Sequence, residues 1–367
     1  MTNQSDNRMG WIRNIEKLEK TTSEYTAEYE LASESQIFGV LDYKNGAIQC
    51  GIMTFKKDSN GTYKYLLRIK YPPYNEEPHF LKANKSGYLF PEGIPGELIS
   101  ILFLFFQCRF FLIAAYSGDL SSNGLKLKTE YFPQIKRCEP YFDPDMFPDG
   151  KRNFAVGLVD FLEKLARIND QYHQRLILGF YNYARALREF GIDEEMVFIR
   201  LVSSIEAFTK WVNLSENDDL FSGVNFENII QSERLSASQK EELKNIFFNV
   251  RKAKTRFANF IQLYSKGFFT GGNFRAPHTR IKKGDLKKAL SAIYDSRSNY
   301  LHQGETMYLS RHMRSGHKWD TDPTTGMIID NRHFSVDKKL PYASFFQRLV
   351  RHCIMQFLSE ISNLENT

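Results

Sequence analysis

Two side chains that can act together on a phosphate lie five positions apart near the end of a predicted helix. Arg297 carries a permanent positive charge, and His302 can take or give a proton near neutral pH. An imidazole can remove the proton from a ribose 2′-hydroxyl or protonate a leaving 5′-oxygen, while a guanidinium can neutralise charge on phosphoryl oxygens. The pair is therefore a candidate for phosphoryl-transfer chemistry.

The helix that carries this pair is expected to start near Asp285 and to stop near Gly304. Its apolar positions follow helical spacing, namely Leu286, Leu290, Ile293, Tyr300 and Leu301. Arg297 falls on the same stripe, where a guanidinium is costly unless it is paired or binds an anion. On a straight helix, positions i and i+5 point about 140° apart. The long arginine side chain, a frayed last turn or a second copy of the helix would have to close that gap.

The stretch Arg297-Ser-x-x-x-His302 resembles the Arg-x4-His signature of the HEPN superfamily. A second stretch, 198–208, contains Ile-Glu-Ala-Phe and is similar to the helix that often precedes the motif helix in these proteins. The resemblance covers roughly residues 150–367 as architecture, and these two stretches in detail. It implies a helical domain that acts as a metal-independent endoribonuclease through 2′-hydroxyl attack, leaves a 2′,3′-cyclic phosphate and forms a homodimer.

Within that superfamily the chain most resembles the ApeA-like HEPN branch. The resemblance implies an effector of prokaryotic antiviral defence or a toxin system, whose N-terminal domain senses a trigger protein or ligand, or holds the nuclease off. The longer spacing between the two stretches and the insert after His302 depart from a minimal HEPN domain and leave the RNA target open. The alternative is a catalytically silent HEPN scaffold that binds a partner protein or a nucleotide.

Glu206 is the first supporting residue, because it lies on the helix expected to face the motif. There it would orient His302 or pair with Arg297; the alternative is an exposed i,i+4 pair with Lys210. Arg297 and His302 also have a purely structural interpretation, as a paired arginine and a cation at a helix C-terminus. Two further polar residues either hydrogen-bond a phosphate or cap the helix end, Ser298 and Asn299.

The insert at 306–339 follows the motif directly and mixes basic with aromatic residues. Such a mixture suits contact with single-stranded RNA. The alternative is a solvated insert with a small hairpin at Thr325-Gly326. The candidate RNA-binding residues are Arg311, Arg314, His317, Lys318 and Trp319.

Composition allows an RNA partner without demanding one, since the net charge is +6 and the pI about 8.9. Four scattered cysteines form neither a zinc spacing nor a disulfide framework, and the N-terminus has no signal peptide, so a cytoplasmic location is expected. No His-x3-His or Glu-x-x-His spacing and no glycine-rich phosphate loop occurs, so neither metal nor cofactor is expected. The apolar segment 98–116 is interpreted as a buried helix, over 97–115, and not as a membrane span, because Gln107 and Arg109 lie at its centre.

The chain divides into an α+β N-terminal domain and an all-α helical bundle. The N-terminal domain, 1–140, combines a short helix at 11–20 with strands from about Gln36 onward, including 47–55, 63–69 and 125–131. A linker rich in proline and aspartate spans 141–152. Six helices predicted over 153–367 indicate an antiparallel bundle, one opening at Asp193 and another with a capping box at Ser238-x-x-Glu241.

Overall fold

The computed structural model describes residues 8–59, 61–73, 93–117, 126–128, 152–211, 235–270, 279–307, 320–321, 328–329, 332–333 and 340–364. Contacts divide the chain into one unit of Met1–Val197 with Leu358–Thr367 and a second unit of Phe198–Phe357. The division passes through two helices, α5 (Glu194–Glu206) and α9 (Ala343–Leu364). It does not coincide with the predicted boundary at 141–152, where only residue 152 is described, so that boundary stays a prediction.

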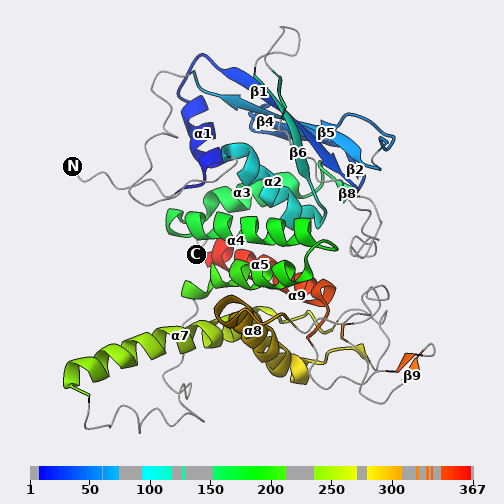
Figure 1. The fold of residues 1–367 in the computed structure, drawn as a ribbon. Helices are drawn as coiled ribbons and strands as arrows, with labels where there is room; N and C mark the ends of the chain where they lie inside the picture. The colour runs from blue at the N-terminus through cyan, green and yellow to red at the C-terminus, as the bar shows by residue number, and fades with distance from the viewer. Residues whose placement is uncertain are drawn as a thin grey trace. The chain divides into compact units, whose positions relative to one another are not determined.

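The first unit contains a six-stranded sheet in which every neighbouring pair is antiparallel, in the order β3-β4-β5-β1-β6-β7 (Figure 1). Its strands are β1 (Tyr25–Ser33), β3 (Val40–Tyr43), β4 (Ile48–Ile52), β5 (Tyr63–Tyr71), β6 (Phe111–Ser117) and β7 (Lys126–Lys128). A separate parallel pair joins β2 (Ile37–Phe38) to β8 (Arg152–Asn153). The strands predicted at 47–55 and 63–69 are thereby confirmed, with shorter bounds for β4. Of the strand predicted at 125–131, residues 126–128 are described and form β7.

Sequence analysis missed β1, which lies inside the sheet between β5 and β6. It placed no strand before about Gln36. The register sets Leu31 opposite Tyr65, and both side chains are fully buried. Between such inward positions β1 carries Glu28 and Glu30, so apolar and polar residues alternate there, which is a strand signal that was overlooked.

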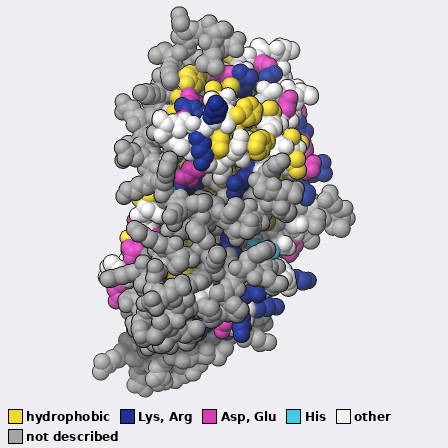
Figure 2. Space-filling model, turned by 90° about the vertical axis from the view of Figure 1, so that its right-hand side faces the viewer, with side chains coloured by type: hydrophobic (Ala, Val, Ile, Leu, Met, Phe, Trp, Pro, Cys, Tyr) yellow, Lys and Arg dark blue, Asp and Glu magenta, His cyan; other side chains and the backbone are white. Residues whose placement is uncertain are grey.

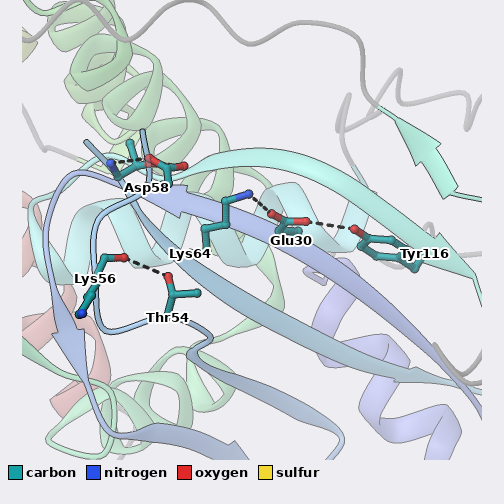
Figure 3. Close-up of polar contacts among 7 residues, drawn as sticks. Glu30, Thr54, Lys56, Asp58, Lys64 and Tyr116 are labelled. Atoms are coloured by element: carbon teal, nitrogen blue, oxygen red, sulfur yellow. Dashed lines mark hydrogen bonds and ion pairs between the residues drawn. The ribbon is translucent and has the colours of Figure 1, made fainter. Parts of the chain in front are cut away.

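The two glutamates of β1 are buried and are neutralised across the outer face of the sheet. Arg68 lies directly opposite Glu28, and its Nε donates to a carboxylate oxygen at 2.6 Å. Glu30 accepts from Lys64 Nζ at 2.6 Å and from the Tyr116 hydroxyl at 3.0 Å (Figure 3). Cross-strand pairs of opposite charge stabilise a sheet, so these pairs help to hold β1 between β5 and β6.

The inner face of the sheet packs on helices through an aromatic core. α1 (Gly10–Leu18) contacts β5 and α2 (Gly93–Phe106), and α2 contacts α4 (Asp170–Glu189). A buried carboxylate fixes the start of α1, because Glu97 accepts from the backbone N–H groups of Gly10 and Trp11, both at 3.0 Å. Fully buried rings fill the interior, namely Tyr65, Phe103, Phe106, Phe110 and Phe154.

The predicted helix over 97–115 is wrong in its second half. α2 ends at Phe106, Gln107 has a left-handed φ of 51°, and the chain continues as β6. A short apolar run fits a buried helix or a buried strand equally well, which explains the error. Arg109, between the two elements, is buried and forms an ion pair with Glu34. Among the described residues, no helix is both long and apolar enough to cross a membrane.

Helices replace strands after β8, largely as predicted. α3 (Leu158–Arg167) and α4 lie in the first unit, and α4 ends at Glu189, two residues before Gly191, whose φ is 73°. The predicted start of α5 is confirmed, since the Asp193 carboxylate accepts from the backbone N–H of Met196 at 3.0 Å. The chain thus combines an N-terminal antiparallel sheet region with a mostly helical C-terminal part.

The second unit contains the rest of α5, α7 (Ala237–Tyr264), α8 (Leu286–Gln303) and most of α9, with short 3₁₀ turns η3 (Thr209–Trp211) and η5 (Lys283–Asp285). The capping box of α7 is formed by Ser236 and Gln239 and not by the predicted Ser238 and Glu241, so α7 starts earlier. A short hairpin of β9 (Ile328–Ile329) and β10 (Arg332–His333) lies after the predicted Thr325-Gly326, which falls outside the described residues. The core is again aromatic, with Phe198, Phe208, Phe257, Phe260, Phe346 and Phe357 buried.

Candidate catalytic site on helix α8

The predicted site contains an ion pair between two helices of the second unit. Arg297 on α8 donates from Nη2 to Oε2 of Glu206, at the end of α5, over 3.0 Å. The arginine side chain is 18% exposed and the glutamate side chain 26%. Of the alternatives left open for Glu206, the structure shows the pair with Arg297 and not the pair with Lys210. An arginine that seemed costly on an apolar stripe is compensated by a partner from the facing helix.

Tyr294 completes this arrangement and was not found by sequence analysis. Its hydroxyl donates to Oε1 of Glu206 at 2.9 Å, so the two carboxylate oxygens are held by two different residues of α8. The Arg297 guanidinium also lies 5.7 Å from the centre of the Tyr294 ring. Burial, and then the adjacent Glu206 carboxylate, raise the pKa of Tyr294 above its usual value. The phenol therefore stays protonated and remains a donor.

The Arg297 guanidinium retains donor capacity beyond this pair. Its Nε is buried without a hydrogen-bond partner, and only Nη2 contacts Glu206. A guanidinium has five N–H donors in a planar fork that fits a phosphate well. Glu206 therefore fixes the orientation of Arg297 through Nη2. The buried Nε is closed to a substrate, so an anion would be bound by the outer nitrogens of the guanidinium.

His302 lies in a different setting, in the last turn of α8. It is exposed, and the described part of the chain gives its ring no polar partner. Gly304, with φ 69°, ends the helix, and its N–H bonds the Asn299 carbonyl. A cation near the C-terminal carbonyls of a helix is favoured by the macrodipole. The imidazole is thus free to meet a substrate, but it also satisfies the purely structural interpretation.

The two small polar residues of the motif are half-buried near the helix end. Asn299 donates from Nδ2 to Glu305 at 3.0 Å, and its carbonyl accepts from Gly304 and, at 3.4 Å, from Glu305. Asn299 therefore supports the C-terminal cap, which was one of its two predicted roles. For Ser298 the described contacts favour neither role.

The helix geometry separates Arg297 from His302 within one chain. α8 is regular through Gln303, so a frayed last turn does not bring the two side chains together. Five residues of regular helix turn them about 140° apart. The predicted apolar stripe also needs correction, because Leu301 is 46% exposed and Tyr300 only half-buried, whereas Tyr294 belongs to the buried set.

The predicted RNA-binding residues Arg311, Arg314, His317, Lys318 and Trp319 lie outside the described residues, so that interpretation stays a prediction. The chain is described again from Asp320, whose carboxylate is buried. It accepts from the Ile281 N–H at 3.2 Å and from Arg348 Nη2 at 3.0 Å. Asp320, which lies within this insert, thus ties it to the segment before α8 and to α9.

Groups of three or more residues of the metal-binding types, close enough to hold an ion, do not occur among the residues that the structure describes.

Comparisons of the chain with models of protein families, with curated proteins and with solved structures find no match. The resemblance to HEPN proteins therefore rests on the two stretches quoted above. Sequence analysis found Glu206 because Ile205 and Phe208 mark a helix whose core face is predictable. Tyr294 could have been found from its position three residues before Arg297, one turn away on the same face of α8.

Proposed function

We propose that the chain is a metal-independent endoribonuclease of the HEPN type, with Arg297 and His302 as its catalytic residues. The observation that carries the proposal is the contrast between these side chains. Arg297 is oriented by Glu206 through Nη2 alone, while His302, on the same helix, is exposed and has no polar partner among the described residues. One group suits charge stabilisation and the other suits proton transfer.

In the proposed reaction, His302 takes the proton from the ribose 2′-hydroxyl as the 2′-oxygen attacks the adjacent phosphorus. The bond from phosphorus to the 5′-oxygen breaks, the leaving oxygen takes a proton from solvent water, and a 2′,3′-cyclic phosphate remains. Arg297 stabilises the negative charge on the non-bridging oxygens during this step. Each RNA chain cut in this way has a cyclic phosphate at one new end and a 5′-hydroxyl at the other.

A homodimer is part of this proposal. The separation of about 140° between the two catalytic positions on regular helix α8 is what supports it. A second copy related by a two-fold axis can place its His302 near the first copy's Arg297, and isologous dimers are the commonest oligomers. Each of two equivalent sites would then contain residues of both chains.

The direct test is to incubate purified protein with single-stranded RNA and to identify the new ends. We expect cleavage with cyclic phosphate ends and no cleavage by the His302→Ala protein. In cells, induced expression should stop growth and leave cut RNA, as expected of a toxin or an effector of antiviral defence. Wild-type protein that leaves RNA intact under both conditions would refute the assignment.

A silent scaffold that binds a partner protein or a nucleotide is the second candidate. The observation that favours it is the same ion pair, because Arg297 already has a carboxylate partner and needs no anion to justify its position. A scaffold would tolerate Arg297→Ala/Glu206→Ala in its cellular function, whereas the nuclease would not.

A further inference from the structure

We infer that single-stranded RNA binds along the exposed side of α8, with lysines at the start of the helix binding its phosphates on the way to His302. This inference rests on the proposed nuclease function and assigns the surface by which that site takes its substrate. The surface is formed by described residues and does not depend on the insert after the motif.

Four exposed lysines surround the start of α8, where Asp285 is the one acid among the described residues 279–290 and the buried Asp320 carboxylate accepts from the Ile281 N–H. The four lysines are Lys282, Lys283, Lys287 and Lys288. The described part of the chain gives none of their ammonium groups an ion-pair partner. Cations at a helix N-terminus oppose the macrodipole, so the cluster is unfavourable for the helix itself. A bound phosphate backbone would neutralise the positive charge of this cluster. Lysine and arginine side chains are also exposed in the lower part of Figure 2.

A regular stripe leads from this cluster to the proposed site. Seven residues of α-helix turn about 700°, only 20° short of two full turns. Lys288, Asp295 and His302 are spaced by seven and therefore follow one side of α8. The span from Lys288 to His302 is about 21 Å at 1.5 Å per residue, the length of a few nucleotides.

The acid in the middle of this stripe is neutralised from the neighbouring helix. Both carboxylate oxygens of Asp295 accept from Lys254 Nζ on α7, at 2.6 and 2.7 Å. Ser291 adds a hydrogen bond from its hydroxyl at 3.2 Å. An exposed ion pair contributes little to stability, but it removes a negative charge from the path of a polyanion. Glu305, beyond the helix end, is held by Asn299, one turn before His302, so one carboxylate lies near the far end of this stripe.

The same helix carries the exposed lysines and the proposed catalytic residues. Charge complementarity therefore indicates that the phosphate backbone of single-stranded RNA binds this surface. Base identity is not read by lysine contacts, so this surface would bind with little sequence preference. Selection of the cleavage position would then fall to groups nearer His302.

The test measures binding of a fluorescein-labelled, mixed-sequence single-stranded RNA to full-length His302→Ala protein by anisotropy over a range of salt concentrations. Adding Lys287→Ala/Lys288→Ala should weaken binding roughly tenfold and reduce the slope of log K against log salt by about 1.4. The matched control, Lys56→Ala/Lys57→Ala, removes two exposed lysines after β4 in the first unit and should change neither quantity.

A rescue experiment separates the charge argument from simple damage to the helix. Lys254→Ala should weaken RNA binding because it leaves Asp295 uncompensated, and Lys254→Ala/Asp295→Ala should restore it.

Equal binding by the lysine variants and the His302→Ala parent, or the same lysine dependence for duplex DNA, would overturn the assignment, as would failure of the parent to bind RNA. If wild-type protein cleaves RNA but its RNA affinity does not depend on these lysines, the binding surface is refuted and the proposed nuclease function stands. If RNA binding depends on these lysines but wild-type protein does not cleave RNA, the binding surface stands and the nuclease function is refuted.

Discussion

Glu206 and Arg297 are 91 positions apart in the chain, yet their side chains meet at 3.0 Å between α5 and α8. The pair orients the only charged residue on the buried stripe of α8 and leaves its Nε without a partner. Substitutions can distinguish a catalytic role of this pair from a purely structural role. The two roles predict different behaviour for Arg297 and for His302.

His302→Ala should lower RNA cleavage by about 10²- to 10⁴-fold, the usual contribution of a general acid or base. Because the side chain is exposed, the free energy of unfolding should change by no more than about 0.5 kcal/mol. Cleavage rates and urea unfolding on the same preparations measure both. The matched control is His352→Ala, another histidine of the second unit. A fully active His302→Ala protein with normal circular dichroism would remove this residue from the mechanism.

Arg297→Lys should be strongly impaired in cleavage, because an ammonium lacks the planar fork. Arg297→Ala should also destabilise the protein, by roughly 1–3 kcal/mol, since Glu206 loses a partner in a half-buried site. Adding Glu206→Gln should recover part of that stability but none of the activity. A double variant that regains cleavage as well as stability would show that the arginine is structural.

Cleavage should survive excess chelator, because the proposed proton transfers and charge stabilisation need only protein side chains. The measurement is the initial rate with and without chelator, at constant ionic strength. If chelator stopped cleavage and a divalent ion restored it, the reaction would depend on a metal and the roles given to Arg297 and His302 would have to be replaced.

Purified protein should be a dimer at micromolar concentration, as measured by light scattering or sedimentation. Mixing Arg297→Ala with His302→Ala chains should then restore part of the activity, because one site of each mixed dimer receives an intact Arg297 from one chain and an intact His302 from the other. Activity should therefore vary with the mixing ratio. A monomer that cleaves RNA at the same concentration would contradict the composite site.

Glu194 should make the first unit less stable as the pH rises. Burial raises the pKa of this carboxyl from 4.5 to about 7, one oxygen accepting from the Gly191 N–H at 3.2 Å and the other having no partner. Between these values the group is ionised in the unfolded chain but protonated in the folded one, so stability falls as the pH rises through that window. Glu194→Gln should remove this loss, seen by comparing urea midpoints at about pH 5 and about pH 8. The same pH dependence in both proteins would assign it elsewhere.

The sequence predicted helices better than strands, for reasons visible in particular residues. Stripes such as Phe161 with Leu165 in α3 have a period that survives local exceptions, and glycines such as Gly191 and Gly304 mark the ends. β1 was overlooked although Glu28 and Glu30 alternate with apolar residues. What the sequence did not show is that both glutamates would be buried and paired with basic residues of β5. Such compensation involves residues far apart in the sequence and has no local signal.

The candidate site was predictable in its parts and not in its geometry. Helical periodicity was enough to place Arg297 on the buried side of α8 and Glu206 on a facing helix. It could not show that Tyr294 would take the second oxygen of that carboxylate, because the choice depends on how two helices cross. Nor could it show that Lys254 would neutralise Asp295, since the two residues lie on different helices and meet only in the folded chain.

The position of β1 bears on how the first unit forms during synthesis. β1 leaves the ribosome before either of its partners, and it must wait for β5 at Tyr63–Tyr71 and for β6 at Phe111–Ser117. Until both have appeared, its backbone groups and its two glutamates have no partners, a condition that favours association with other chains. Once the sheet is complete, both edges of β1 are bonded. Its amide hydrogens should then exchange with solvent among the slowest of the unit.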